Sequence, residues 1–365
     1  MYQNDDRVVV TLDAGGTNFV FSAVQANEFI VTPITLPSHS DNLDECLAQL
    51  VAGFTQVFDK LEKPAVAISF AFPGPADYAH GIIGGYLPNF PSFRDGVALG
   101  PFLEEKFGVP VYINNDGDLF AYGEALAGKL PELNRNIASA GGSKSYKSLI
   151  GYTFGTGFGV GHVYNNTLHL GDNSCIETFC LRNKLNPEIL AEEGVAVRAV
   201  KRVYAELSGQ DADNLEPKDI FDIAEGNREG NRKAAITAFE RMGEVAGDAM
   251  ATAASLLDGV IVIGGGITAA KKYIMPSLLR ELRSTITTAS GEVVSRVQPK
   301  VYDLDNQTEF AEFVKGKDRM IKVYGTEKYV NYEEEKRIGV TISSIGAAKA
   351  ISLGAYNFAL SQIDN

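Results

Sequence analysis

Two glycine-rich turns, each set between apolar strand-like runs, could bind phosphate groups. The first contains the sequence DAGGTN at residues 13–18, and the second contains FGTGFG at residues 154–159. Paired glycines let a backbone approach phosphate oxygens closely, and the free amides of a tight turn can donate hydrogen bonds to them. Either turn alone also fits an ordinary β-hairpin. Because the two turns occupy equivalent places in two similar strand–turn–strand segments, we expect them to clamp one triphosphate.

A carboxylate stands beside the first turn. Asp13 directly follows the apolar run VVVTL, so we expect it at the carboxyl end of a strand, next to Gly15 and Gly16. Oxygen ligands are those that Mg²⁺ prefers, and a strand-end carboxylate can hold the hydrated ion. The pattern therefore predicts that Asp13 binds Mg²⁺ through water.

A second carboxylate ends another strand pattern. Asp116 follows VPVYINN, where a strand gives way to a helix. In open α/β sheets, ligands gather at the carboxyl ends of strands, where a carboxylate can accept the proton of an attacking hydroxyl. Aspartate is also a strong N-cap residue for a helix. From the spacing alone, catalytic base and helix cap are equal alternatives for Asp116.

Two further segments carry weaker signals. Three glycines, Gly264 to Gly266, follow the buried strand pattern GVIVI, but no strand ending in an acidic residue lies about 20 residues later, as a dinucleotide-binding fingerprint requires. An adenosine-contacting turn fits better, and a structural turn is the alternative. Asn89, within PNFPSF, places an amide among prolines and aromatic rings. That setting suits either sugar recognition or a plain loop.

The elements that must position these residues follow an α/β pattern. Besides the strands of the two hairpins, strands are predicted at 65–72, 109–116 and 259–266, and helices at 43–61, 99–108, 116–127, 187–208, 233–257, from Lys271, and at 343–363. Residues 129–147 are predicted to form a surface loop, and 304–338 a surface insertion. The two hairpins begin near residues 8 and 149, which indicates two related domains.

The composition excludes several classes of protein. The chain has 365 residues and a formal net charge of −13, which allows two domains and argues against a nucleic-acid or anionic-membrane surface. No apolar run approaches ~18 residues, so no membrane span is expected. The start MYQNDDRVVV does not resemble a signal peptide. Three irregularly spaced cysteines, Cys46, Cys175 and Cys180, predict reduced thiols in a cytoplasmic protein.

Taken in order, these motifs resemble those of the ROK family of sugar kinases and repressors, within the actin-like ATPase and hexokinase superfamily. The matching segments are DAGGTN, FPGPAD, PNFP, INNDGDLFAYGE, FGTGFGVG, CIET, VIVIGGGI and ISSIGAAKAISLGA. The resemblance implies an α/β, two-lobed actin-like and ribonuclease H-like fold, each lobe a mixed sheet flanked by helices. Residues 1–117 with about 345–365 would form the N-terminal lobe, and 118–344, including the insertion, the C-terminal lobe.

The resemblance also implies roles for the matching residues. Asp116 would be the catalytic base, and Asn89, Asn115 and Asp116 would contact the sugar. ATP and Mg²⁺ would contact the two phosphate loops and the third glycine segment: Asp13, Gly15, Gly16, Thr17, Asn18, Gly155, Thr156, Gly157, Gly265 and Gly266. The implied reaction is ATP-dependent phosphorylation of a hexose or N-acetylhexosamine, with glucose or mannose favoured, at the 6-hydroxyl. We expect a homodimer.

The sequence departs from the family pattern after the second phosphate loop. Family kinases carry a GExGH segment and a CxCGxxGC zinc loop there, whereas YNNTLHLGDNSCIETF runs almost directly to CIET. Glu177 remains as a candidate sugar ligand, but Cys175 lacks the partners that tetrahedral zinc needs. His162, His169 and Cys180 lie nearby at spacings that match no zinc motif. We therefore predict that the protein has no structural zinc.

Two alternatives to a kinase follow from the same resemblance. A repressor of this family needs an N-terminal helix-turn-helix, yet the first phosphate loop already begins at Asp13. A non-catalytic sugar sensor would account for the missing zinc loop. The presence of Asp116 and of both glycine turns favours the kinase over the sensor.

Overall fold

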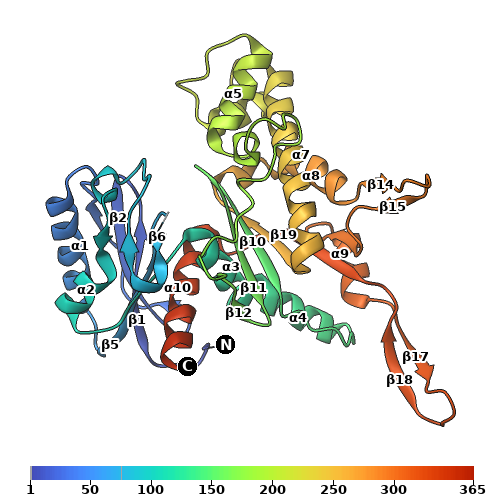
Figure 1. Cartoon of the computed structure of the whole chain (residues 1–365), viewed down its shortest axis with the longest axis horizontal. Coiled ribbons are helices and arrows are strands. Elements are labelled where there is room, and N and C mark those ends of the chain that lie inside the picture. Colours follow the sequence, from blue (N-terminus) through green and yellow to red (C-terminus); the bar gives the residue numbers. More distant parts are fainter. Residues whose placement is uncertain (1, 75) are drawn as a thin grey trace. The chain divides into compact units, whose positions relative to one another are not determined.

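The computed structural model describes residues 2–74 and 76–365, and the chain divides into two compact units. Unit 1 comprises Met1–Gly128, Gly161–Ile176 and Ile345–Asn365; unit 2 comprises Lys129–Val160 and Glu177–Ser344. Each combines helices and strands, so the predicted α/β class is confirmed (Figure 1). Met1, the first residue of the predicted N-terminal lobe, and Pro75 of the FPGPAD motif lie outside the described residues.

Unit 1 is built on a mixed sheet with the order β3-β2-β1-β5-β9, with β4 paired to β2. Its strands are β1 (Val8–Ala14), β2 (Asn18–Gln25), β3 (Glu28–Phe29), β4 (Ile34–Pro37), β5 (Ala65–Ala71) and β9 (Val111–Asn114). A small sheet joins β6 (Ala76–Asp77), β7 (Ile82–Ile83) and β8 (Val97–Ala98). Two 3₁₀ helices, Tyr78–His80 and Pro91–Phe93, lie in the same region of the chain.

Alternate side chains of β1 and β5 divide the unit 1 core between the two faces of the sheet. Val8, Val10 and Leu12 pack with helices α1 (Leu43–Phe58) and α2 (Leu99–Phe107), while Val9 packs with α10 (Ala347–Ile363). Helix α3 (Asp116–Leu126) lies against α10 at a very close approach. A Cβ at Gly123 would lie 1.9 Å from the Ala350 carbonyl oxygen, and one at Gly354 would lie 1.9 Å from that of Leu119. This glycine-lined crossing places α3, which the sequence analysis assigned to the second lobe, in unit 1.

The second sheet has the order β12-β11-β10-β13-β19-β16. Its strands are β10 (Leu149–Phe154), β11 (Phe158–Tyr164), β12 (Thr167–Leu168), β13 (Val260–Gly264), β16 (Lys300–Asp303) and β19 (Arg337–Ile342). One face packs against the helices of the largest core cluster: α5 (Val197–Ser208), α6 (Pro217–Glu225), α7 (Arg232–Leu257) and α8 (Lys271–Leu282). Two 3₁₀ helices, Ala191–Gly194 and Gly266–Ala270, precede α5 and α8.

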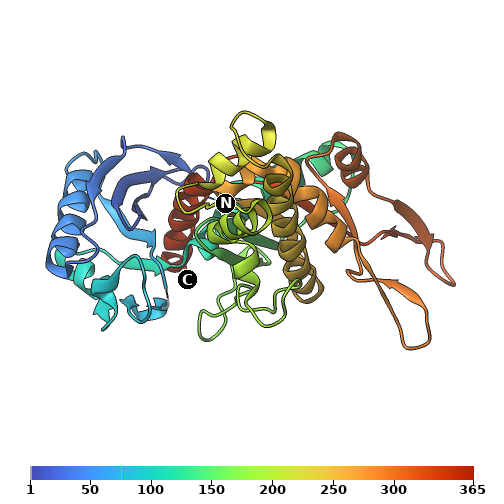
Figure 2. The ribbon, with the colours of Figure 1, turned by 90° about the horizontal axis from the view of Figure 1, so that it is seen from above.

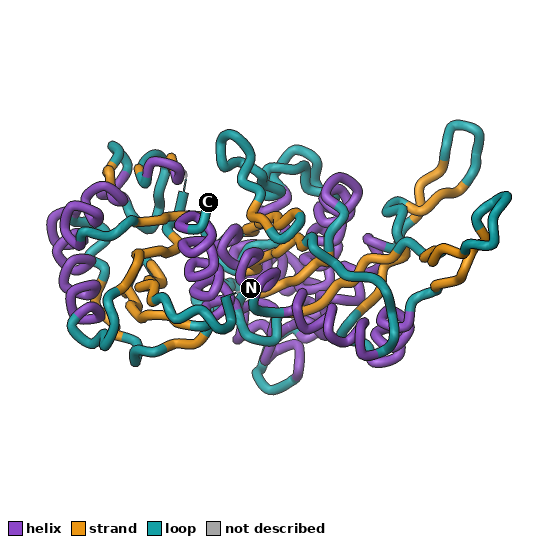
Figure 3. The backbone as a smooth tube through the Cα atoms, turned by 90° about the horizontal axis from the view of Figure 1, so that it is seen from below, coloured by secondary structure: helices purple, strands orange, loops and turns teal. Residues whose placement is uncertain are grey.

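Two hairpins project from unit 2. They are β14 (Thr285–Thr287) with β15 (Val293–Ser295), and β17 (Asp318–Lys322) with β18 (Tyr329–Glu333). Figures 2 and 3 show both as two-stranded extensions that leave the helical body of the unit. Neither hairpin shares a sheet with any other described strand.

Three predictions of secondary structure are wrong in part. The predicted loop 129–147 contains helix α4 (Lys129–Ser139), because Leu130, Leu133 and Ile137 recur at helical spacing and are buried. The predicted helix 187–208 begins only at Val197, because a bend and a short 3₁₀ helix occupy the residues after Pro187.

The predicted insertion 304–338 is also more ordered than expected. It contains helix α9 (Gln307–Lys315) and the hairpin β17–β18, and its last residues belong to the central strand β19. Ile338 is buried in the core of unit 2. Among the described residues, no helix combines the length and the apolar character that crossing a membrane requires.

Candidate functional site

In unit 1, three parallel strands end in one row. Asp13 of β1 is in register with Ala71 of β5, which is in register with Asn114 of β9. Two strand spacings separate Asp13 from Asn114, which is about 10 Å between their Cα atoms. The chain reaches Asp116 two residues later. The register therefore brings both predicted carboxylates to the same carboxyl edge of the sheet, where α/β proteins bind ligands.

The structure separates the two alternatives left open for Asp116. The N-cap of α3 is Asn115, whose Oδ1 accepts a hydrogen bond of 2.7 Å from the Asp118 backbone N–H. Asp116 is the first residue of the helix, and its Oδ1 accepts from the Gly117 N–H at 2.9 Å. Because the neighbouring Asn115 caps the helix, Asp116 is not the N-cap, and its carboxylate is available for chemistry.

The electrostatics around Asp116 favour a base. Its side chain has access to solvent, yet the surrounding protein removes much of its hydration. This burial raises the pKa of Asp116 above its ordinary value, and the negative charge of Asp13 raises it further. Burial also raises the pKa of Asp13. Two carboxylates whose ionisation is disfavoured by their surroundings suit a place where a cation or a proton arrives.

The first glycine turn is held by hydroxyl groups that the sequence analysis missed. The Gly15 N–H donates to the Asn18 carbonyl at 3.0 Å and closes the turn. The Gly16 carbonyl accepts from Ser38 Oγ at 2.5 Å and from Ser40 Oγ at 3.0 Å. These two serines fix the peptide plane after Gly16. Nothing in the local pattern LPSHSDN distinguishes them from ordinary loop serines.

Asn89 lies beside this turn. A Cβ at Gly16 would stand 3.0 Å from the Asn89 Cβ, so the two backbones are in close contact. The adjacent Phe90 is buried, and its ring packs on those of Phe19 and Phe72 with centroid distances of 6.1 Å and 4.6 Å. This aromatic anchor holds Asn89, whose side chain is exposed, beside the turn that follows β1. Thr17 and Asn18 of the turn are exposed as well.

In unit 2, the second glycine turn joins β10 and β11. The Gly155 N–H donates to the Gly157 carbonyl at 3.2 Å, and Thr156 is exposed at the tip. Glu192 Oε2 accepts from the Phe158 N–H at 2.9 Å and would lie 2.9 Å from a Cβ at Gly157. Glu192 lies more than 30 residues further along the chain, where no local pattern links it to the turn.

A cation balances this carboxylate. Arg198 donates to Glu192 at 2.7 Å, to Glu193 at 2.6 Å and to the Thr156 carbonyl at 3.2 Å. Without the arginine, Glu192 would present an uncompensated negative charge beside a turn that we expect to bind phosphate. Arg198 is thus a positioning residue that both braces the turn and neutralises its neighbour.

Replacing Arg198 is expected to weaken nucleotide use. We predict that Arg198→Met raises the KM for ATP about fivefold, equivalent to one lost hydrogen bond of about 1 kcal/mol, with little change in the KM for sugar. Arg202→Met is the matched control, because Arg202 lies one turn later on α5 and binds Glu206 and the Glu193 carbonyl rather than Glu192 or the Thr156 carbonyl. Steady-state kinetics with varied ATP test this. An equal effect of both variants would contradict the role given to Arg198.

The third glycine segment follows β13. Gly264 is in register with Thr153 of β10, and the next residue, Gly265, has φ = +100°. A Cβ at Gly265 would lie 2.2 Å from the Phe154 carbonyl oxygen, so only glycine fits. Gly265 therefore packs the end of β13 against the end of β10, immediately before the Gly155–Gly157 turn. Gly266 is exposed, with open space where a Cβ would stand.

Glu177 lies near the same strand. Burial raises the pKa of the Tyr152 hydroxyl, and the negative charge of Glu177 adds to that shift, so the carboxylate stands close to Tyr152 of β10. Glu177 is half-buried. The described structure thus places this candidate sugar ligand in unit 2, beside the strand that leads into the second glycine turn.

The residues around the shortened cysteine loop form a pair rather than a cluster. His162 Nδ1 lies 3.2 Å from His169 Nδ1, and Cys175 and Cys180 are free and exposed. Within residues 2–74 and 76–365, no three histidine, cysteine, aspartate or glutamate side chains are grouped as metal ligands would be.

The absence of structural zinc remains a prediction. We expect dialysed protein to contain far less than one zinc per chain, because tetrahedral structural sites need about four ligands. Elemental analysis by mass spectrometry tests this, with a zinc-binding protein dialysed in parallel as the control. About one zinc per chain would contradict the prediction.

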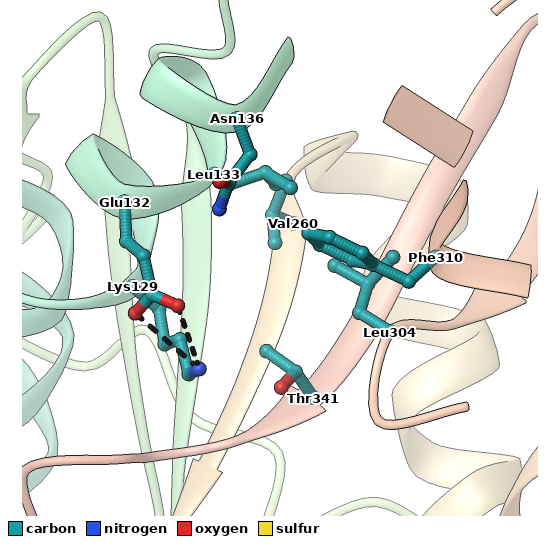
Figure 4. A pocket seen from close by; sticks show the side chains of 8 residues that line it. All are labelled: Lys129, Glu132, Leu133, Asn136, Val260, Leu304, Phe310 and Thr341. Atoms are coloured by element: carbon teal, nitrogen blue, oxygen red, sulfur yellow. Dashed lines mark hydrogen bonds and ion pairs between the residues drawn. The ribbon is translucent and has the colours of Figure 1, made fainter. Parts of the chain in front are cut away.

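One cavity of about 210 Å³ lies in unit 2 on the side of the sheet that α4 and α9 cover (Figure 4). It is lined by Lys129, Glu132, Leu133, Asn136, Val260, Leu304, Phe310 and Thr341. Lys129 Nζ and Glu132 form an ion pair of 3.4 Å within it. None of the predicted nucleotide or sugar residues lines this cavity, so it carries no part of the assignment.

The chain is similar to known proteins along most of its length. The model of the ROK family matches residues 9–177 and 188–307. A crystal structure of a glucokinase from Parabacteroides distasonis is 57% identical, with a TM-score of 0.89 and 99% of both chains covered. An N-acetyl-D-glucosamine kinase from Vibrio parahaemolyticus is 26% identical over 285 residues, 70% of this chain and 83% of that protein.

A more distant solved structure has the same fold. A ROK hexokinase from Thermus thermophilus is 18% identical, with a TM-score of 0.66, and the alignment covers 97% of this chain and 99% of that one. Together, these similarities confirm the predicted actin-like fold of mixed sheets flanked by helices.

Proposed function

The chain belongs to the ROK family, and on that premise we propose that it is an ATP-dependent sugar kinase that phosphorylates a hexose at its 6-hydroxyl, with Asp116 as the general base. The observation that carries the kinase assignment is the 57% identity to a glucokinase over 99% of both chains. The position of Asp116 at the ligand-binding edge of the unit 1 sheet, with its neighbour Asn115 capping the helix, supports its role as the base.

Glucose is the first substrate that we propose. The 57% identical solved structure is that of a glucokinase, whereas the N-acetyl-D-glucosamine kinase is 26% identical. N-acetylglucosamine and mannose are the alternatives to test. Asn89, Asn115 and Glu177 are proposed to bind the sugar hydroxyls through their amide and carboxylate groups.

The proposed reaction is an in-line transfer. The 6-hydroxyl oxygen of the sugar forms a bond to the γ-phosphorus of ATP while the bond from that phosphorus to the β–γ bridging oxygen breaks, and ADP leaves. Asp116 orients the hydroxyl and accepts its proton late in the transfer, when the oxygen becomes acidic. The two glycine turns are proposed to bind the phosphate oxygens through backbone N–H groups.

The first turn has donors that suit Mg²⁺. Asp13 is exposed at the end of β1 and stands beside the backbone of Gly15 and Gly16, and its pKa is already raised by burial. A carboxylate in such surroundings gains from a neighbouring cation. When bound with ATP, Mg²⁺ neutralises part of the phosphate charge. Asp13 is the residue proposed to hold it, through water.

A sugar panel tests the proposed function. Purified protein is incubated with ATP, Mg²⁺ and one of glucose, mannose, N-acetylglucosamine, N-acetylmannosamine or fructose, and release of ADP is followed. We expect sugar-dependent release, with the highest kcat/KM for glucose. Binding of glucose without ADP release above the sugar-free control would instead favour a sugar sensor.

The proposed role of Glu177 in sugar binding can be tested separately from ATP binding. We expect Glu177→Gln to raise the KM for sugar by about tenfold or more, since a hydrogen bond to a charged group contributes ~1.5–3 kcal/mol. The KM for ATP should stay near that of the wild type. Glu188→Gln is a control at an exposed glutamate of the same unit. Equal damage to sugar and ATP use, or none, would count against a sugar-binding role.

A further inference from the structure

The glycine turn that follows β1 rests on residues 38–40, which directly follow β4. The Gly16 carbonyl accepts hydrogen bonds from both Ser38 Oγ and Ser40 Oγ, at 2.5 Å and 3.0 Å. The next carbonyl, that of Thr17, accepts from the Ser38 backbone N–H at 2.9 Å. We call residues 38–40 the serine strap. Two successive carbonyls of the turn thus face the strap.

The strap is held in place by contacts from elsewhere in unit 1. Ser38 is 1% exposed, and His39 has φ = +45°, a left-handed conformation that residues other than glycine rarely adopt. The Ser40 carbonyl accepts from Ser92 Oγ at 2.7 Å, and Ser92 belongs to the 3₁₀ helix that follows Asn89. Backbone of this kind persists only where the surrounding structure fixes it. The positions of both strap hydroxyls are therefore set by the fold.

The orientation of the two carbonyls decides where the neighbouring N–H groups point. In a trans peptide, the C=O and N–H bonds point in opposite directions. Because the carbonyls of Gly16 and Thr17 face the strap, the N–H groups of Thr17 and Asn18 point away from it. Thr17 is exposed, and among the described residues its N–H donates to no backbone carbonyl. Successive N–H groups on one side of a turn make a site for an anion.

The two serines hold one oxygen through separate hydrogen bonds. A carbonyl oxygen has two lone pairs, so it can accept from both hydroxyls at once. If one hydroxyl is removed, the other still holds the Gly16 carbonyl against the strap. If both are removed, the peptide can rotate, because glycine lacks a Cβ and adopts many backbone conformations. Only the joint loss of Ser38 and Ser40 hydroxyls therefore releases the Thr17 N–H from its orientation.

We propose that Ser38 and Ser40 are a redundant pair of positioning residues, which aim the Thr17 N–H at a phosphate oxygen of bound ATP. The inference rests on the proposed function, because it needs a nucleotide at the first glycine turn. The hydroxyls of both serines are already used on the Gly16 carbonyl, so they act through the turn and not on the nucleotide.

Nucleotide titrations of alanine variants test the pair. Each protein is titrated with a non-hydrolysable ATP analogue and Mg²⁺, and the Kd is measured by calorimetry. We expect Ser38→Ala and Ser40→Ala each to raise the Kd about threefold, and the double variant to raise it about 30-fold or more. Independent effects would multiply to only about ninefold. The Kd of adenosine, measured by competition with the analogue, should not change, because adenosine offers no phosphate to the Thr17 N–H.

Two single variants separate this role from a general loss of packing. Ser22→Ala removes a hydroxyl of the same kind, because Ser22 is buried in β2 and its Oγ donates to the Val31 carbonyl at 2.9 Å. Ser40→Thr keeps the donor at this half-buried position. Both should bind the analogue as the wild type does. Ser38→Cys with Ser40→Ala replaces the double alanine variant if that protein does not fold, since a thiol fills the space but is a weak donor.

Three results would overturn the inference. They are a double variant whose Kd rises by no more than the product of the single effects, an equal loss of adenosine binding, and a Ser40→Thr variant as weak as Ser40→Ala. In each case, a wild type that binds the analogue and phosphorylates a sugar leaves the kinase assignment intact. A wild type that binds no analogue would instead overturn the proposed function, and this inference with it.

Discussion

Asp116→Asn is expected to reduce turnover by about 10²- to 10⁴-fold, the usual effect of losing a positioned general base. Asparagine keeps the shape of the side chain and an oxygen that can accept from the Gly117 N–H, but it cannot receive the proton of the sugar hydroxyl. Because Asn115 caps the helix, the exchange leaves the cap of α3 in place. The KM values for sugar and ATP should therefore change much less than kcat.

The raised pKa of Asp116 adds a pH signature. Only the ionised carboxylate is a base, so kcat/KM should fall on the acid side with an apparent pKa above that of an ordinary aspartate. The residual activity of Asp116→Asn should not show this fall in kcat/KM at acid pH.

The stability of the variant gives a second check. A carboxyl group whose pKa is raised by folding contributes stability that is fully present below its unfolded pKa and is lost as the pH rises through its folded pKa. At neutral pH the ionised Asp116 therefore destabilises the native state, and Asp116→Asn should melt at the same temperature or higher. Near-normal kcat in a stable Asp116→Asn protein would remove Asp116 as the base.

Gly155→Val is expected to raise the KM for ATP by about 10- to 100-fold, which corresponds to ~1–3 kcal/mol of steric conflict. The open space at Gly155 makes it the most informative glycine of the second turn, because a Cβ there meets no atom of the chain within 4 Å. The fold should therefore accept the larger side chain, and any conflict must come from the bound nucleotide. Kinetics at varied ATP and saturating sugar measure the effect.

The other turn glycines are less suitable for this test. A Cβ at Gly16 would lie against Asn89, and one at Gly157 against Glu192, so those variants would also disturb the protein. Gly155→Ala serves as a graded control and should give a smaller increase than Gly155→Val. Normal ATP affinity in both Gly155 variants, with normal melting temperatures, would contradict phosphate binding at this turn.

The architecture was largely predictable because strand and helix periodicities are strong in this chain. VVVTLDA and VYIN form the predicted strands, and the helices expected at 43–61 and 233–257 are present at 43–58 and 232–257. The segment 129–147 was predicted wrongly, as a loop. It is rich in polar residues and contains Pro131, so the helical spacing of the three buried apolar residues of α4 was not recognised. A helix with so narrow an apolar stripe looks like a loop until the surface that it covers is known.

The site was predictable where its residues follow a recognisable strand. It was not predictable where a residue from a distant part of the chain supports them. Asp13 and Asp116 each end a recognisable strand, and the register then places them at one edge. Ser38 and Ser40 support the Gly16 carbonyl from another segment, and Glu192 and Arg198 support the second turn from more than 30 residues away. These supporting contacts form only in the folded chain, and no pattern in the neighbouring sequence predicts them.

Transfer of labelled phosphate tests the central claim most directly. Protein is incubated with glucose, Mg²⁺ and ATP labelled in its γ-phosphoryl group, and the products are separated and identified by mass spectrometry. We predict that the wild type places the label on glucose at the 6-hydroxyl with one ADP formed per sugar phosphate, and that Asp116→Asn does so about 10²- to 10⁴-fold more slowly. Label that appears only in inorganic phosphate, or that reaches the sugar equally fast without Asp116, would contradict it.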